Sequence, residues 1–159
     1  MLLKKFLTVV LLMMMAQLTF AQVSNPFFEK IKTFKGAELD DISEARMELI
    51  RPSMSDNPAS KALMDKTKSM KTLSIDPENT PAARPTARAE AAKLEKAGMT
   101  KFMSEVKDAQ EINIYILKKG STIIEFFFWV YDHEEGFFAM QMIGTFTEDD
   151  LDKLAELGN

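Results

Sequence analysis

The stretch Ile123–Tyr131 reads IIEFFFWVY, and Glu125 is its one charged residue. A run of β-branched and aromatic residues of this length is typical of a β-strand, and apolar side chains on both faces are typical of a strand in the middle of a covered sheet. Successive side chains of a strand point to opposite faces, so two sets are expected. One set is Ile124, Phe126, Phe128 and Val130, and the other is Ile123, Phe127, Trp129 and Tyr131.

The segments on either side of this stretch have the pattern of further strands. Residues 112–117 precede it across the turn at 118–121, in which Gly120 can adopt a positive φ angle. Residues 137–144 follow it across the turn at 132–136, and residues 102–106 form a fourth, weaker strand. The C-terminal half therefore predicts an antiparallel β-meander.

The N-terminal half alternates expected helices and strands. Helices are predicted at 26–34, 43–50, 59–66 and 84–97, and strands at 37–42 and 68–75. The early strands could pair parallel to each other through right-handed crossovers. The fold class is thus α+β, with helices packed on a mostly antiparallel sheet.

A closing helix is predicted from its start signal. Thr147 is the expected N-cap, and Asp150 occupies the capping-box position, although Glu or Gln is more usual there. Phe146 and Leu151 form a hydrophobic staple. The expected buried stripe is Leu151, Leu154 and Leu157, and Gly158 ends the helix.

The first 21 residues have the layout of a secretory signal peptide. Lys4 and Lys5 precede an apolar run, and Thr19 and Ala21 offer small residues to a signal peptidase. We expect cleavage near Ala21, which leaves 22–159 as a single domain in the periplasm or outside the cell, with no span of the membrane. The alternative is an uncleaved anchor, because no charge occurs between Phe6 and Phe28.

Composition narrows the classes of partner. Removal of Lys4 and Lys5 with the signal would leave 18 basic and 24 acidic residues, a net charge of −6. A nucleic-acid partner needs clustered cations, so binding to nucleic acid is not expected. The chain has no cysteine, so core packing without disulfides must hold the fold.

Catalytic, metal and cofactor signatures are not found in the sequence. His133 is the one histidine and lies among Asp132, Glu134 and Glu135, which could suggest a metal site or a general base; a solvated turn is the simpler interpretation. The acidic group at 40–44 lacks the ladder of a calcium loop. The expectation is a protein that is not an enzyme and has no cofactor.

One face of the predicted sheet mixes aromatic and polar side chains, and it is the candidate binding face. Its residues are Tyr115, Glu125, Phe127, Trp129 and Gln141. An exposed aromatic surface usually marks a binding site. The alternative is that a helix covers this face, for which the Phe-rich segment 26–34 is the candidate.

Five segments together resemble a known family of exported proteins of Gram-negative bacteria. They read FFEK from Phe27, MKTLSI from Met70, FMSEVKD from Phe102, IYILKKG from Ile114 and IGTFT from Ile143. The family is domain of unknown function 4252, and the resemblance that these segments carry covers nearly all of the mature sequence. The resemblance implies export and a single α+β domain. It supplies no catalytic residue.

Three functions are compatible with these observations. The first is a non-enzymatic domain that binds another protein at the cell envelope. The second is a periplasmic carrier of a small hydrophobic ligand or lipid, with a pocket around Phe127, Phe138, Met140 and Met142. The third is a hydrolase that uses the acidic turn around His133.

Overall fold

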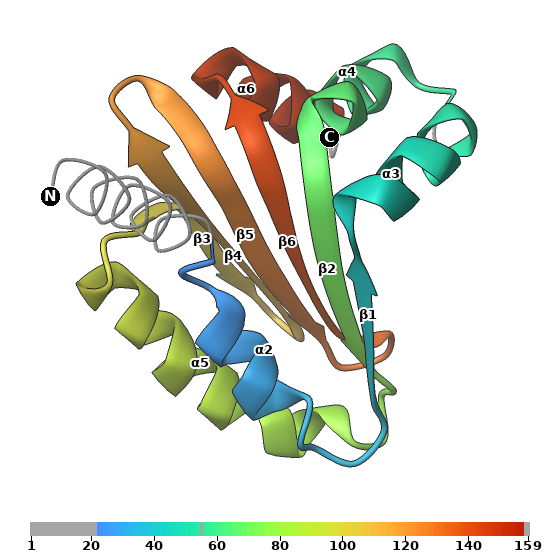
Figure 1. The fold of residues 1–159 in the computed structure, drawn as a ribbon. Helices are drawn as coiled ribbons and strands as arrows, with labels where there is room; N and C mark the ends of the chain where they lie inside the picture. Colours follow the sequence, from blue (N-terminus) through green and yellow to red (C-terminus); the bar gives the residue numbers. More distant parts are fainter. Residues whose placement is uncertain (1–21, 55, 158–159) are drawn as a thin grey trace, which may run out of the picture.

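The computed structural model describes residues 22–54 and 56–157, with side chains up to Lys153 in the last helix. The predicted signal peptide, Gly158 and the side chains of Leu154 and Leu157 lie outside this part. Six strands form one antiparallel sheet in the order β1-β2-β6-β5-β4-β3 (Figure 1). The strands are β1 (Ala37–Ile42), β2 (Thr67–Ile75), β3 (Thr100–Lys107), β4 (Gln110–Lys119), β5 (Thr122–Asp132) and β6 (Gly136–Phe146).

Five α-helices and one short 3₁₀ helix complete the described chain. They are α2 (Asn25–Ile31), α3 (Glu44–Ile50), η1 (Arg51–Ser53), α4 (Pro58–Lys66), α5 (Thr80–Lys96) and α6 (Glu148–Leu157). The expected α+β class and the C-terminal meander are confirmed. Helix α5 begins four residues before the predicted start at Arg84, because Pro81 sits in the first turn, where its missing N–H costs nothing.

The early strands do not pair parallel, so that prediction is wrong. Strand β2 runs antiparallel to both β1 and β6. The connection between β1 and β2 forms α3 and α4, which have seven and nine residues. Both helices lie at one end of the sheet, so the chain re-enters the sheet at the end it left (Figure 1).

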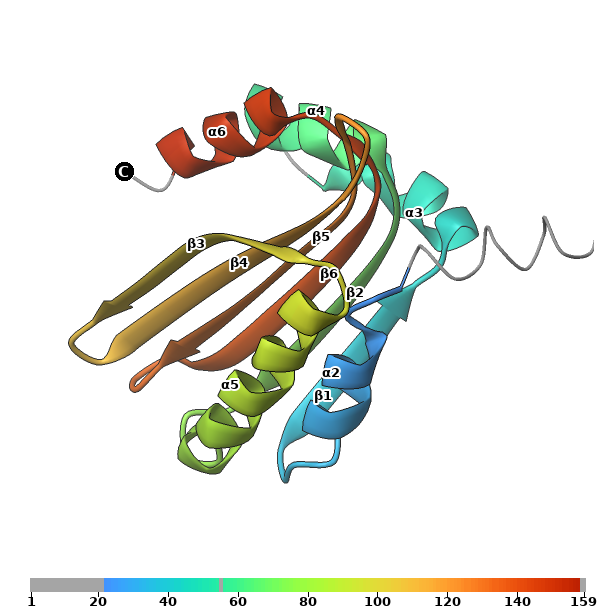
Figure 2. The same cartoon turned by 90° about the vertical axis from the view of Figure 1, so that its left-hand side faces the viewer.

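Helices α2 and α5 pack on one face of the sheet, which we call the covered face (Figure 2). The amphipathic pattern of 26–34 places Phe27, Phe28 and Ile31 against the sheet, and all three are buried. Helix α5 presents small residues, Ala83, Ala87 and Ala91, and thereby lies close to the strands. The main core of the protein therefore lies on this face.

A second core occupies one end of the opposite face, where α3, α4 and α6 gather (Figure 2). Its buried residues are Ile42, Met47, Leu63, Met70, Ile116, Ile123, Phe126, Met142, Phe146 and Leu151. The rest of this face, which we call the open face, has no helix packed on it in the described chain. Its side chains from β4, β5 and β6 are partly exposed: Ile112, Ile114, Phe128, Val130, Phe138 and Met140.

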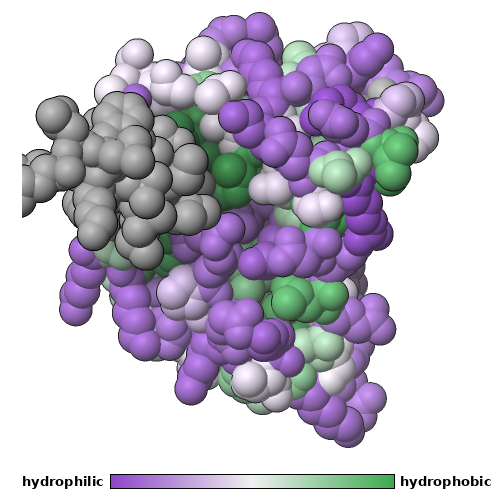
Figure 3. All heavy atoms as spheres, in the orientation of Figure 1, coloured by the Kyte–Doolittle hydropathy of each residue, from purple (hydrophilic) through white to green (hydrophobic). Residues whose placement is uncertain are grey.

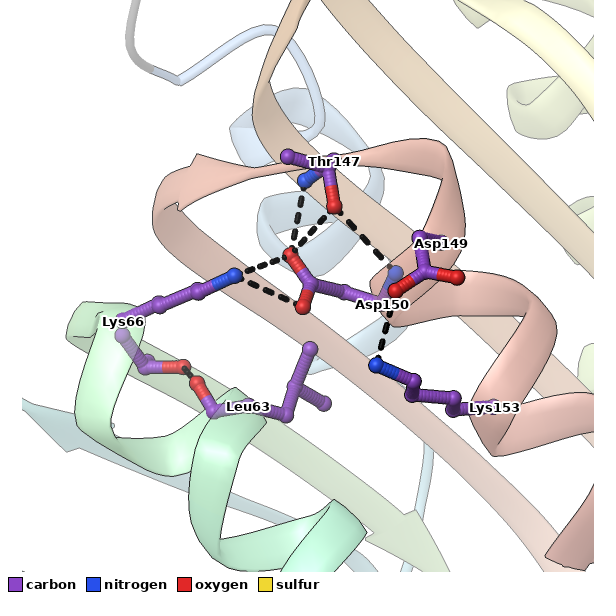
Figure 4. A network of polar contacts seen from close by, with 7 residues as sticks. Leu63, Lys66, Thr147, Asp149, Asp150 and Lys153 are labelled. Atoms are coloured by element: carbon purple, nitrogen blue, oxygen red, sulfur yellow. Dashed lines mark hydrogen bonds and ion pairs between the residues drawn. The ribbon is translucent and has the colours of Figure 1, made fainter.

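The predicted start of α6 is confirmed (Figure 4). An Asp150 carboxylate oxygen accepts the backbone N–H of Thr147 at 2.8 Å, and the Thr147 hydroxyl accepts the N–H of Asp150 at 3.3 Å. Lys66 at the end of α4 donates to both Asp150 oxygens at 2.7 Å. Asp150, although shorter than the usual Glu or Gln, thus caps its own helix and also joins α6 to α4.

The side chains at the start of β5 do not alternate strictly between the two faces of the sheet. The register between β5 and β6 shifts between Ile123 and Glu125, as in a β-bulge. As a result Ile123 lies in the second core, and Ile124 packs against the covered-face core. The prediction for these two residues is therefore wrong, whereas Phe126 to Tyr131 alternate as expected.

Candidate functional site

The predicted binding face is not a surface in this structure. Tyr115, Glu125, Phe127, Trp129 and Gln141 are buried beneath α2 and α5, with exposed fractions of 0–3%. Rings of α2 lie on the sheet here. The Phe27 and Phe28 rings lie 4.8 and 5.7 Å from that of Phe127. The helix-covered alternative is the one observed, and the exposed-face interpretation is corrected accordingly.

Glu125 has a structural environment that the sequence did not reveal. One carboxylate oxygen accepts the backbone N–H of Val23 and the other that of Ser24, each at 2.9 Å. The Ser24 hydroxyl and the Gln141 side-chain amide also donate to it, the latter at 3.0 Å. These four donors satisfy a carboxylate that has no access to solvent. The segment just after the predicted cleavage position is thereby fixed to the centre of the sheet.

The acidic turn around His133 is organised by backbone contacts. An Asp132 oxygen accepts the N–H groups of Glu135 and Glu134 at 3.0 and 2.8 Å, and these bonds lower the pKa of that carboxyl. The backbone N–H of His133 donates to the Ala109 carbonyl at 3.1 Å. Within residues 22–54 and 56–157, no group of three or more His, Cys, Asp or Glu side chains is placed to hold a metal ion.

The open face carries an apolar groove of about 450 Å³. Its floor comes from β4, β5 and β6, and its end wall from α4. The nine lining residues are all apolar: Leu63, Met64, Ile112, Ile114, Phe126, Phe128, Val130, Met140 and Met142. Met140 and Met142 belong to the predicted hydrophobic pocket, but Phe127 lies on the other face and Phe138 lies just beyond the groove.

An acidic pocket of about 480 Å³ continues the open face at the end away from α4. Four of its lining residues are carboxylates: Glu38, Asp76, Asp132 and Glu135. Gly136 closes the turn between β5 and β6 with a φ of +105°, and a Cβ there would lie 2.4 Å from the Ile75 carbonyl oxygen. This close approach holds the turn, and with it Asp132 and Glu135, against the end of β2.

The side of the molecule with α2 and α5 has a different character. It is largely hydrophilic, and the hydrophobic residues visible on it are scattered (Figure 3). No helix in the described part of the chain is both long and apolar enough to cross a bilayer. The contiguous apolar groove of the open face is therefore the candidate functional site.

Comparison with known proteins places the chain in a family whose sequence model spans the whole sheet. The sequence model of domain of unknown function (DUF4252) matches residues 17–154, which includes every strand of the sheet. The chain belongs to this family. The predicted resemblance is thereby confirmed, and the description of the DUF4252 family gives no function.

Other comparisons add little. No curated protein matches the sequence. Among solved structures, the chain is similar to a hot-dog-like protein from Thermanaerovibrio acidaminovorans at 14% identity, over 80% of this chain and 93% of that one. The TM-score is 0.17, so this likeness carries no argument about fold or function.

Sequence reasoning missed the open face because it treated that side of the sheet as ordinary core. Residues Ile112, Ile114 and Ile116 alternate regularly, and Phe138, Met140 and Met142 do the same. The signal that could have indicated the open face is the length of the helices. Helices 43–50 and 59–66 are too short to cover these strands together, so part of the apolar face is expected to stay open.

Proposed function

We propose that this protein is an exported domain of the cell envelope that binds another protein through its open face and catalyses no reaction. The observation that carries the proposal is the apolar groove. It is a continuous surface of aliphatic, aromatic and methionine side chains, and in the described chain α4 closes one end of it while no helix covers the rest. Large exposed apolar patches on small domains usually mark interaction sites.

The composition of the groove supports a protein as the occupant. Interface cores are rich in aromatic residues and methionine and poor in charge, as this groove is. Methionine adapts its shape to a partner better than branched residues do. The groove is also open along its length, whereas carriers usually enclose most of a small ligand.

Site-specific photo-crosslinking in cells tests the proposal. A photoreactive residue at Ile112 or Phe138 should give a discrete protein adduct, whereas the same residue at Leu49, which is exposed on α3, should not. Val130→Glu should abolish the adduct because it places a charge in the groove. The matched control is Leu49→Glu, which places the same charge at an exposed position of α3, outside the groove.

Val130→Glu and Leu49→Glu should both unfold at temperatures close to that of the parent, because neither side chain is fully buried. Absence of any adduct from the open face, or an adduct that survives Val130→Glu unchanged, would count against the proposed function.

A carrier of a small hydrophobic ligand is the second candidate. It is favoured by one observation, namely that no charged side chain lines the groove. Organic extraction of protein purified from the periplasm, followed by mass spectrometry, tests it. A stoichiometric lipid that is lost in Val130→Glu would support the carrier function, and an extract without lipid would count against it.

A further inference from the structure

We infer that the partner segment bound by the open face is amphipathic and basic: its apolar side chains fill the groove and its Lys or Arg side chains enter the acidic pocket. This inference rests on the proposed function and specifies the chemistry of the partner. It is carried by the juxtaposition of the two sites on one face of the sheet.

The groove and the acidic pocket form one continuous surface. Val130 lines both of them. Phe128 lines the groove, Phe138 lines the pocket, and their ring centroids are 5.8 Å apart. Asp132 follows Val130 on the same face of β5, because side chains two positions apart point the same way. A bound segment can therefore contact both sites at once.

The pocket is strongly negative. It is lined by four carboxylates and by no Lys, Arg or His side chain. In the described chain none of Glu38, Asp76, Asp132 and Glu135 makes an ion pair with Lys or Arg, and Gln110 adds a polar side chain to the lining.

Three basic residues lie near the pocket in the chain without lining it. Lys35 precedes Gly36, Lys107 pairs in register with Gln110, and His133 follows Asp132 in the turn. None of them belongs to the lining, so the negative field of the pocket remains available to a cation from outside. A basic side chain placed there would be attracted over the distances at which exposed charges act.

The two ends of the face are chemically different, and this determines where the basic end of a bound segment lies. Helix α4 closes the groove at one end with Leu63 and Met64, and the carboxylates lie at the other end. From Phe126 to Asp132 the strand advances about 20 Å. That length corresponds to about 13 residues of helix. The basic end of such a segment lies at the β5–β6 turn, where the carboxylates are.

The same charges argue against a lipid bilayer as the occupant. Anionic lipid surfaces attract basic segments, whereas this apolar face ends in four carboxylates. Glu105 adds another carboxylate to the rim, since it pairs in register with Ile112 at the edge of the open face. A basic protein segment satisfies both the apolar groove and this rim.

Binding of synthetic peptides to the purified protein tests the inference. The probe is a fluorescent amphipathic helix of about 14 residues with a leucine face and three C-terminal lysines. The first control peptide carries three glutamates in place of the lysines. The second keeps the lysines and replaces the leucines by serine. Affinities are measured by fluorescence anisotropy at low and high ionic strength.

We expect the lysine peptide to bind at least about tenfold more tightly than the glutamate peptide at low salt, with the difference reduced at high salt. The double variant Glu38→Gln/Glu135→Gln should weaken the lysine peptide by about threefold to tenfold and should not weaken the glutamate peptide, because it removes repulsion from that peptide. The matched double variant Glu44→Gln/Glu48→Gln on α3 removes the same charge and should have no effect.

The other outcomes separate this inference from the proposed function. Equal binding of lysine and glutamate peptides, lost in Val130→Glu, would overturn the charge inference and leave the protein-binding face intact. Binding to phosphatidylglycerol vesicles instead of peptides would overturn both. Self-association in sedimentation experiments that is lost in Val130→Glu would identify a second copy as the occupant and overturn the basic-segment inference.

Discussion

The buried carboxylate of Glu125 offers the sharpest test of the core. One of its oxygens accepts only the N–H of Val23, and the other accepts the three remaining donors. In Glu125→Gln the amide nitrogen takes the place of the first oxygen, because that orientation loses fewer bonds, and it points a donor at the N–H of Val23. One of the four hydrogen bonds is lost, at about 1.5–3 kcal/mol for a bond to a charged group. A neutral amide loses less solvation on burial, which offsets part of this cost. We expect a loss of about 1–2 kcal/mol in the free energy of unfolding.

Equilibrium unfolding in urea, followed by the fluorescence of the single tryptophan, Trp129, measures this loss. Ser24→Ala should cost about 1–2 kcal/mol, because it removes one donor to Glu125 and one acceptor for Gln141. The double variant Glu125→Gln/Ser24→Ala should cost less than the sum, since the two residues share one network.

The control is Glu105→Gln, which makes the same chemical change at an exposed position of β3 and should shift stability by less than about 0.5 kcal/mol. A Glu125→Gln protein as stable as this control would refute the reasoning. So would strict additivity of the two single substitutions, since it would show that Ser24 and Glu125 do not interact.

Three further predictions address the helices and the core. Trp129→Ala should destabilise by about 3–5 kcal/mol, seen in a thermal melt by circular dichroism, because the ring is 1% exposed and leaves a cavity. Thr147→Ala should cost about 1 kcal/mol in urea unfolding through loss of the cap of α6. Burial of Asp150 raises the pKa of its carboxyl, but bonds from Lys66 and Thr147 outweigh burial and hold that pKa below 3.8. Its contribution is therefore present above that pH and lost as pH falls through the lowered pKa. Asp150→Asn should cost about 1–2 kcal/mol in urea at pH 7 and progressively less as pH falls through the lowered pKa, and a cost that does not change with pH would contradict this assignment.

Most secondary-structure elements could be predicted because their signals are local. The aromatic stretch at 123–131, the turn with Gly120 and the cap at Thr147 each depend on residues within a few positions. The bulge near Ile123 could not be predicted, because it depends on register with β6. The start of α5 was predicted four residues too late although its signal, Pro81 in the first turn, is local.

The candidate site shows the limit of prediction more clearly. The sequence identified a strand with two apolar faces, and nominated the face with Tyr115 and Trp129 for binding. Which face is covered depends on where α2 packs, and α2 is about 100 residues away from β5 along the chain. The aromatic face is core, and the face of Ile112 and Phe128 is open.

The sequence by itself determined the α+β class, the meander, the closing helix and the DUF4252 resemblance, because alternation, turns and caps act between neighbouring residues. Only the tertiary structure decided which apolar face stays open, and that Glu125 holds the segment at Val23 and Ser24. The physical reason is that burial depends on what packs above a strand. Helices α3 and α4 are too short to cover the second face, and only their placement at one end of the sheet shows which part of that face stays open.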